Sequence, residues 1–102
     1  MRDLYHRKER LEYWVERVRK DLNDPDRNDV LQFTEYLKEK DKSILWIIRC
    51  ITALLAIRRQ LDKPFKNTTK EDIKLFFKWM EQKNYKVSTH EKFRVILKIF
   101  YK

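Results

Sequence analysis

The chain of 102 residues contains no glycine. Glycine is the residue that most easily adopts left-handed backbone conformations and allows a backbone to approach a ligand closely. Phosphate-binding P-loops, dinucleotide-binding turns and EF-hand calcium loops all require glycine at fixed positions. The sequence therefore excludes these phosphate, nucleotide and calcium sites.

Cysteine and histidine are also scarce. Cys50 is the only cysteine, which excludes a disulfide framework and a thiolate zinc site. The two histidines, His6 and His90, lie far apart in the sequence and form no HExxH-type pair. We therefore expect no metal site and no cofactor. Cys50 stands among isoleucines, so we expect a buried and inert thiol with a raised pKa.

Apolar residues recur with helical spacing in five segments, and no strand signal is longer than three residues. The expected helices cover about residues 3–22, 28–40, 43–61, 69–83 and 88–102. Pro25 and its turn-forming neighbours separate the first two, and the third is so apolar that it should be central. We predict an all-α fold, a compact bundle of four core helices in two helix hairpins plus an N-terminal helix.

Side chains that can cap helices stand at several of the expected ends. Asp26 or Asn28 would cap the second helix, Ser43 the third, and Ser88 or Thr89 the fifth. Thr69 would cap the fourth helix, with Asp72 as its partner three residues on. Asn84 would take the left-handed position after the fourth helix that glycine usually occupies.

The net charge of +9 is unevenly distributed along the chain. Residues 1–42 contain 11 Lys or Arg and 11 Asp or Glu, whereas residues 43–102 contain 14 and 5. Such an excess indicates a polyanionic partner, either nucleic acid or an acidic membrane surface. The alternative is that the lysines only solvate exposed helix faces. The same alternative holds for two basic stripes with a spacing of four residues, Lys70, Lys74 and Lys78 in one and Arg94, Lys98 and Lys102 in the other.

Two basic clusters at helix starts are candidate DNA-binding sites, because backbone N–H groups, hydroxyls and cations together suit a phosphate. The first comprises Lys42, Ser43, Trp46 and Arg49, and the second comprises Lys86, Ser88, Thr89 and Lys92. Trp46 and Arg49 lie three residues apart and share a helix face. They either contact DNA or are partly buried, with Trp46 filling the core.

No catalytic residue is predicted. Ser88, Thr89 and His90 are adjacent, but neighbouring residues on a helix point in different directions and do not form a nucleophile with its base. The longest mostly apolar stretch, residues 44–57, is too short and too polar to span a membrane. Residues 1–22 are charged throughout and do not resemble a signal peptide. We expect a cytoplasmic, intracellular protein with no membrane partner.

The last third of the chain contains a familiar set of motifs. Residues 69–73 read Thr-Lys-Glu-Asp-Ile, the turn contributes Tyr85, Ser88 and Thr89, and the last helix contributes Leu97, Phe100 and Tyr101. This pattern resembles the core-binding, SAM-like N-terminal domain of tyrosine recombinases, the phage-integrase family. The resemblance covers about residues 28–102 and is strongest after residue 68, with Asn84 standing where the family has glycine.

The resemblance implies a DNA-binding domain of a tyrosine recombinase or integrase that acts in DNA integration and recombination. Its second and fourth core helices, here residues 43–61 and 88–102, would approach the major groove of double-stranded DNA. Residues 1–27 would be an N-terminal helix and linker, and residues 28–102 the core-binding domain. The first helix has only one apolar stripe and a breaker-containing connection follows it, so residues 28–102 should stay folded without residues 1–22 if the four-helix core carries the stability.

The resemblance also implies what this chain lacks. The Arg–His–Arg–Tyr machinery of the family belongs to a separate C-terminal domain, so the chain would be a monomeric fragment, or a stand-alone domain, without strand-cleaving activity. In a full-length protein of prokaryotic or viral origin it would meet other recombinase protomers on DNA. The rival interpretation is a helical protein-interaction domain whose basic surface provides solubility.

Overall fold

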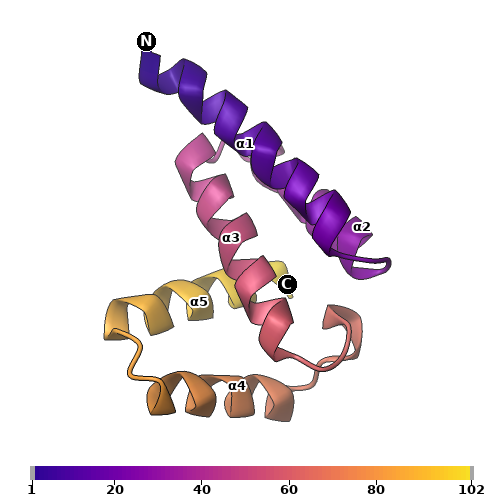
Figure 1. Ribbon diagram of the computed structural model, residues 1–102, viewed down its shortest axis with the longest axis vertical. Coiled ribbons are helices and arrows are strands. Elements are labelled where there is room, and N and C mark those ends of the chain that lie inside the picture. The colour runs from indigo at the N-terminus through magenta and orange to yellow at the C-terminus, as the bar shows by residue number, and fades with distance from the viewer. Residues whose placement is uncertain (1, 102) are drawn as a thin grey trace. The chain divides into compact units, whose positions relative to one another are not determined.

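The structure is a computed structural model that describes the backbone of residues 2–101 and the side chains of residues 7–101 (Figure 1). The described residues form no strand. Their elements are α1 (Arg2–Asp21), α2 (Asp26–Glu39), α3 (Ile44–Gln60), the 3-10 turn η1 (Phe65–Asn67), α4 (Lys70–Gln82) and α5 (Val87–Phe100). The predicted all-α fold, with an N-terminal helix followed by two helix hairpins, is confirmed. Lys102, the end of one predicted basic stripe, lies outside the described residues.

The chain divides into a first unit, residues 1–55, and a second unit, residues 56–102. The boundary falls inside α3, so this helix contributes residues to both units. α1 belongs to the same unit as α2, whereas the sequence suggested a separate segment up to residue 27.

In the first unit, α1 and α2 lie side by side and contact each other (Figure 1). Leu11 and Val18 of α1 and Leu22 just after it are buried, while Trp14 and Val15 are only half-buried. The apolar stripe of α2 is buried throughout, as is most of the apolar part of α3 within this unit. These buried residues are Val30, Phe33, Leu37, Ile47, Ile48, Cys50, Ile51, Ala53, Leu54 and Leu55.

The start of α2 differs from the prediction that Asp26 or Asn28 would cap it. The helix begins at Asp26 itself, after Pro25, and no side chain caps it. Pro25 has the αR conformation, so the chain turns into the helix before either candidate cap is reached. Asp26 and Asp29 instead lie in the first turn, where the helix dipole favours a negative charge.

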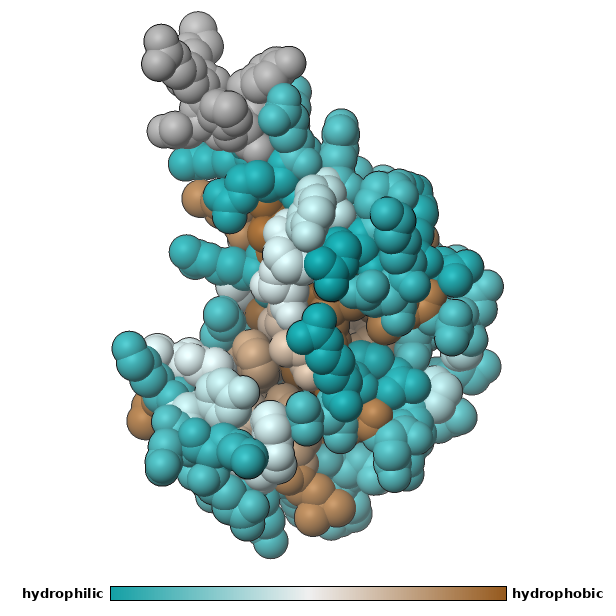
Figure 2. Space-filling view, viewed as in Figure 1, coloured by the Kyte–Doolittle hydropathy of each residue, from teal (hydrophilic) through white to brown (hydrophobic). Residues whose placement is uncertain are grey.

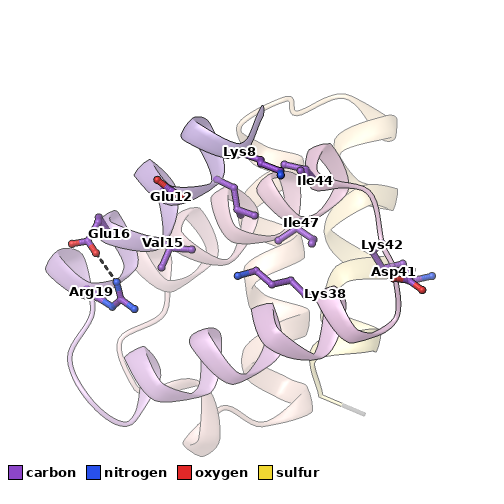
Figure 3. Close-up of a pocket in the computed structure, with 11 residues that line it drawn as sticks. Lys8, Glu12, Val15, Glu16, Arg19, Lys38, Asp41, Lys42, Ile44 and Ile47 are labelled. Atoms are coloured by element: carbon purple, nitrogen blue, oxygen red, sulfur yellow. Dashed lines mark hydrogen bonds and ion pairs between the residues drawn. The ribbon is translucent and has the colours of Figure 1, made fainter. Parts of the chain in front are cut away.

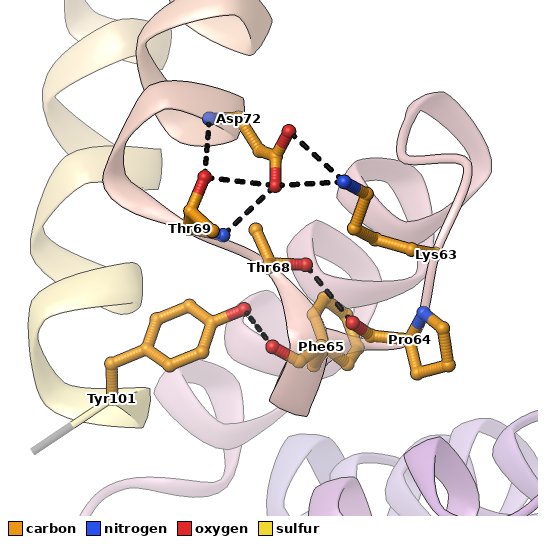
Figure 4. A network of polar contacts seen from close by, with 7 residues as sticks. All are labelled: Lys63, Pro64, Phe65, Thr68, Thr69, Asp72 and Tyr101. Carbon is orange, nitrogen blue, oxygen red and sulfur yellow. Dashed lines mark hydrogen bonds and ion pairs between the residues drawn. The ribbon is translucent and has the colours of Figure 1, made fainter.

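The core of the second unit includes a residue from the connection after α3, Phe65 of η1, which is 1% exposed. Its ring packs edge-on against Phe100 with the ring centroids 5.0 Å apart. The hydroxyl of Tyr101 donates a hydrogen bond of 2.9 Å to the Phe65 carbonyl (Figure 4). These contacts join the end of α5 to the segment before α4. Phe76, Met80, Phe93, Ile96 and Leu97 are also buried.

The predicted capping box at α4 is confirmed (Figure 4). The Thr69 hydroxyl accepts the Asp72 backbone N–H at 3.2 Å, and the Asp72 carboxylate accepts the Thr69 backbone N–H at 2.9 Å. The ammonium of Lys63 lies 3.2 Å from the same carboxylate. Because the charged form receives these bonds, the Thr69 N–H first and Lys63 next, the pKa of Asp72 is lowered.

The two helix hairpins are connected by turns with the same backbone pattern. Asn84 after α4 has the predicted left-handed conformation, with φ of 59°, and Asp41 after α2 has the same one, with φ of 55°. Tyr85 N–H donates to the Met80 carbonyl and Asn84 N–H to the Glu81 carbonyl, which is a Schellman motif. The equivalent bonds after α2 run from Lys42 to Leu37 and from Asp41 to Lys38.

Candidate nucleic-acid interface

The first predicted cluster lies in the first unit, at the start of α3. Ser43 caps this helix as predicted, because its hydroxyl accepts the Trp46 backbone N–H at 3.1 Å. Lys42 and Arg49 are exposed, and Trp46 is half-buried. Trp46 was expected either to contact DNA or to fill the core, and the structure places it partly in the core and partly at the surface. The charges that this cluster offers to solvent come from Lys42 and Arg49.

Lys42 also stands at the edge of a groove that could not be predicted from the sequence (Figure 3). The groove has a volume of about 730 Å³ and lies between α1 and residues 38–47. Its lining contains four apolar residues, four cations and three acids. They are Leu11, Val15, Ile44 and Ile47, then Lys8, Arg19, Lys38 and Lys42, then Glu12, Glu16 and Asp41. Acids and cations therefore both line the groove, and one of the cations, Arg19, is paired with Glu16. This mixed charge does not favour binding of an anion.

The second predicted cluster lies in the second unit, at the start of α5, where the prediction of a Ser88 or Thr89 cap is wrong. α5 begins at Val87, one residue earlier than predicted, and no side chain caps it. The backbone carbonyl of Lys86 accepts the N–H groups of Thr89 and His90 at 3.0 and 3.2 Å. Ser88 and Thr89 therefore lie inside the first turn of α5, and their hydroxyls are not used as caps.

The side chains of the second cluster differ in exposure. Lys86 and Ser88 are exposed, while Thr89 and Lys92 are half-buried. The ammonium of Lys92 lies 5.7 Å from the centre of the Phe93 ring, so part of this side chain rests on the core. Lys86 is the most accessible cation of the cluster.

The two clusters lie in different units, yet each occupies the same position relative to its own turn. A shift of 43 residues places Asp41 on Asn84, the two left-handed residues. The same shift places Trp46 on Thr89 and Arg49 on Lys92. Each hairpin thus carries a cation at the same distance along its second helix. The sequence analysis did not detect this correspondence, because few of the paired residues are identical.

Nearly all of the net positive charge lies in the second unit. Residues 1–55 contain 12 Lys or Arg and 11 Asp or Glu, and residues 56–102 contain 13 and 5. The second unit therefore carries +8 of the net +9. Within it, Lys63 pairs with Asp72 and Lys74 with Glu71. Six further exposed lysines form no ion pair with described residues, namely Lys66, Lys70, Lys78, Lys83, Lys86 and Lys98.

Cys50 behaves as predicted. It is fully buried, and burial raises the pKa of its thiol to about 12, so the thiolate that reacts with electrophiles and metals is suppressed. Among the described residues, no three His, Cys, Asp or Glu side chains come together in a way that could hold a metal ion. Hydrophilic residues dominate the surface visible in Figure 2, with smaller apolar areas between them.

Comparison of the chain with protein-family models, with curated proteins and with solved structures finds no match. Within the described part of the chain, no helix has the length and apolar character needed to cross a membrane.

Proposed function

We propose that the chain binds double-stranded DNA, in the manner of the core-binding domain of a tyrosine recombinase. The observation that carries the proposal is the concentration of +8 in the second unit, where several exposed lysines have no acidic partner among described residues. Phosphate contacts supply most of the affinity of such proteins for DNA, and surplus cations are what they require. The resemblance of residues 69–101 to the recombinase domain supports the same function.

In this proposal the start of α5 contacts the DNA backbone. Lys86 is exposed beside the first turn of α5, where the helix dipole also favours an anion, and Lys92 lies farther along the helix. Lys42 and Arg49 offer a weaker contact from the first unit, whose net charge is close to zero. The chain itself cleaves no strand, and it acts inside the cell, where the DNA is.

The salt dependence of binding tests the proposal. Contacts with about 4–6 phosphates give a slope of log K against log salt of roughly −4 to −5, since each neutralised phosphate contributes about −0.9. Fluorescence anisotropy with a labelled duplex at several salt concentrations measures the slope. A slope near zero, or no binding at tens of micromolar protein near 50 mM salt, would contradict the proposal.

Two double variants of equal charge locate the contact. Lys86→Gln with Lys92→Gln removes two cations at the start of α5, whereas Lys70→Gln with Lys78→Gln removes two unpaired cations from α4. We expect the α5 variant to weaken duplex binding by about 1–2 kcal/mol, the range for two charge-assisted contacts. The α4 variant should lose only a few tenths of a kcal/mol, through screened attraction. Equal losses would show that α5 is not the contact surface.

A protein-interaction domain is the second candidate function, and the groove of the first unit favours it. An apolar lining within a mixed-charge rim suits a protein partner better than a polyanion. Absence of duplex binding in the salt experiment would favour this candidate.

A further inference from the structure

The turns of the two hairpins have the same backbone but different side chains. The connection between α2 and α3 reads Lys40-Asp41-Lys42-Ser43, and the one between α4 and α5 reads Lys83-Asn84-Tyr85-Lys86. At the left-handed position, an acid in the first turn is replaced by a neutral amide in the second. An aromatic residue, Tyr85, stands in the second turn where Lys42 stands in the first. The backbone alone therefore does not explain the composition of the second turn.

The second turn exposes apolar surface that the first does not. Val87, just after the turn, is 77% exposed, whereas the equivalent Ile44 is half-buried at the groove. Tyr85 is 45% exposed, and every residue from 81 to 88 is exposed. A tyrosine ring and a valine thus stand at the surface with no described residue covering them fully.

The position of the Tyr85 ring is fixed from both its backbone and its side chain. Its backbone N–H donates to the Met80 carbonyl at 3.3 Å, within the Schellman motif. Its ring packs against Trp79, with the ring centroids 5.8 Å apart and the planes inclined by 44°. An aromatic ring that is held in place and still half-exposed loses little conformational entropy when a ligand packs on it.

Cations stand on both sides of Tyr85 along the chain. Lys83 and Lys86 are exposed and form no ion pair with described residues, and the connection contains no acid. The nearest acids along the chain are Glu81 and Glu91, which line a shallow depression beside Tyr85 together with Arg94. Proteins that hold unpaired bases combine exposed aromatic rings, on which the bases stack, with nearby cations that contact the phosphates, and this turn carries both kinds of residue.

We propose that the turn between α4 and α5 binds unstacked bases of DNA, with Tyr85 as the stacking platform and Lys83 and Lys86 on the flanking phosphates. The inference rests on the proposed function, because it assumes that DNA is the ligand, and it adds a preference for distorted over regular duplex. Stacking on an aromatic ring tolerates any base, so the preference depends on unpairing rather than on sequence.

The test compares a labelled regular duplex with the same duplex carrying a central bulge of unpaired thymidines, by anisotropy at one fixed salt concentration. The natural chain should bind the bulged duplex about tenfold more tightly, which is within the range that one stacked base supplies. Tyr85→Ala should abolish this difference, and Tyr85→Phe should preserve it, because phenylalanine keeps the ring.

Tyr36 provides the matched control. It is 41% exposed, stacks on Phe33 and has the Lys40 ammonium 5.7 Å from its ring, but it lies on the near-neutral first unit. Tyr36→Ala should leave both affinities unchanged. Far-UV circular dichroism of each variant verifies that the helices are retained.

The outcomes separate this inference from the proposed function. Salt-dependent binding without preference for the bulge, or a preference that Tyr85→Ala retains, would overturn the inference and leave the proposed function standing. Failure to bind either duplex would overturn both. Loss of the preference in Tyr36→Ala as well as in Tyr85→Ala would also overturn it, because the effect would not be specific to the turn.

Discussion

Val18 allows a quantitative test of whether α1 is part of the folded core. Its side chain is completely buried in the first unit, in the stripe that also buries Leu11 and Leu22. Val18→Ala removes two methyl-sized groups, worth about 0.8 kcal/mol each in transfer free energy. The cavity that remains adds to this loss, so we expect the free energy of unfolding to fall by about 2–3 kcal/mol.

Urea unfolding followed by circular dichroism measures this change. The midpoint should fall while the slope m stays constant, since the surface exposed on unfolding is nearly unchanged. In a thermal scan, a loss of this size corresponds to a decrease in Tm of roughly 8–24 °C. Val95→Ala on α5 makes the same chemical change at a residue that is 43% exposed. Its effect should stay within about 0.5 kcal/mol.

A loss below about 0.5 kcal/mol for Val18→Ala, equal to that of the control, would refute this reasoning. That result would mean that α1 is an appendage, and it would agree with the sequence-based expectation that residues 28–102 fold without residues 1–22. The burial of Leu11 and Val18 in α1, and of Leu22 just after it, gives the opposite expectation, because a helix that fills part of the core cannot be removed without exposing that core.

Three further predictions concern the capping box and the buried thiol. Thr69→Ala should lower the free energy of unfolding by about 1 kcal/mol in urea titrations at pH 7, the usual loss for a helix cap. Because the pKa of Asp72 is lower in the folded state, its carboxylate stabilises the protein above its unfolded pKa of about 3.9. The stability gap between the natural chain and Asp72→Asn should therefore shrink as pH falls through the folded pKa, and a gap that is constant from pH 7 to pH 2 would contradict this. Cys50, with its thiol pKa of about 12, should react with a thiol reagent at pH 8 only as fast as the protein unfolds, and rapid labelling of the folded protein would show that it is accessible.

The sequence was sufficient to predict the helices and much of the core. Apolar periodicity located all five α-helices because each is long enough to show at least two turns of pattern. The caps Ser43 and Thr69 were predictable because each side chain bonds within its own first turn. Asn84 was predictable for a related reason, since few residues other than glycine adopt the left-handed conformation readily.

The misses depend on interactions that local pattern does not encode. Phe65 is a single aromatic residue in a connection, with no periodicity to show that it is buried against Phe100. The groove beside Lys42 requires α1 and the turn after α2 to be close in space, which sequence spacing cannot establish. At α5, two hydroxyl residues suggested a cap, but the preceding Schellman turn fixes the helix start at Val87. The eight residues proposed to contact DNA remain predictions.

The two left-handed residues connect the fold to the proposed function. A chain without glycine has few residue types for such a position, and Asp and Asn both adopt it more readily than most residues, because both have short polar side chains. The backbone therefore accepts either residue at 41 and at 84, where φ is nearly the same.

What differs between the two turns is the charge. Asp41 places an acid in the near-neutral first unit, whereas Asn84 leaves the turn of the basic unit without one. An aspartate at residue 84 could also adopt the turn, as Asp41 does, but would place a negative charge between Lys83 and Lys86 along the chain, where the proposed phosphates lie. The conformational requirement explains why both positions carry a residue of this kind, and the proposed DNA contact is a reason for the second to be the neutral one.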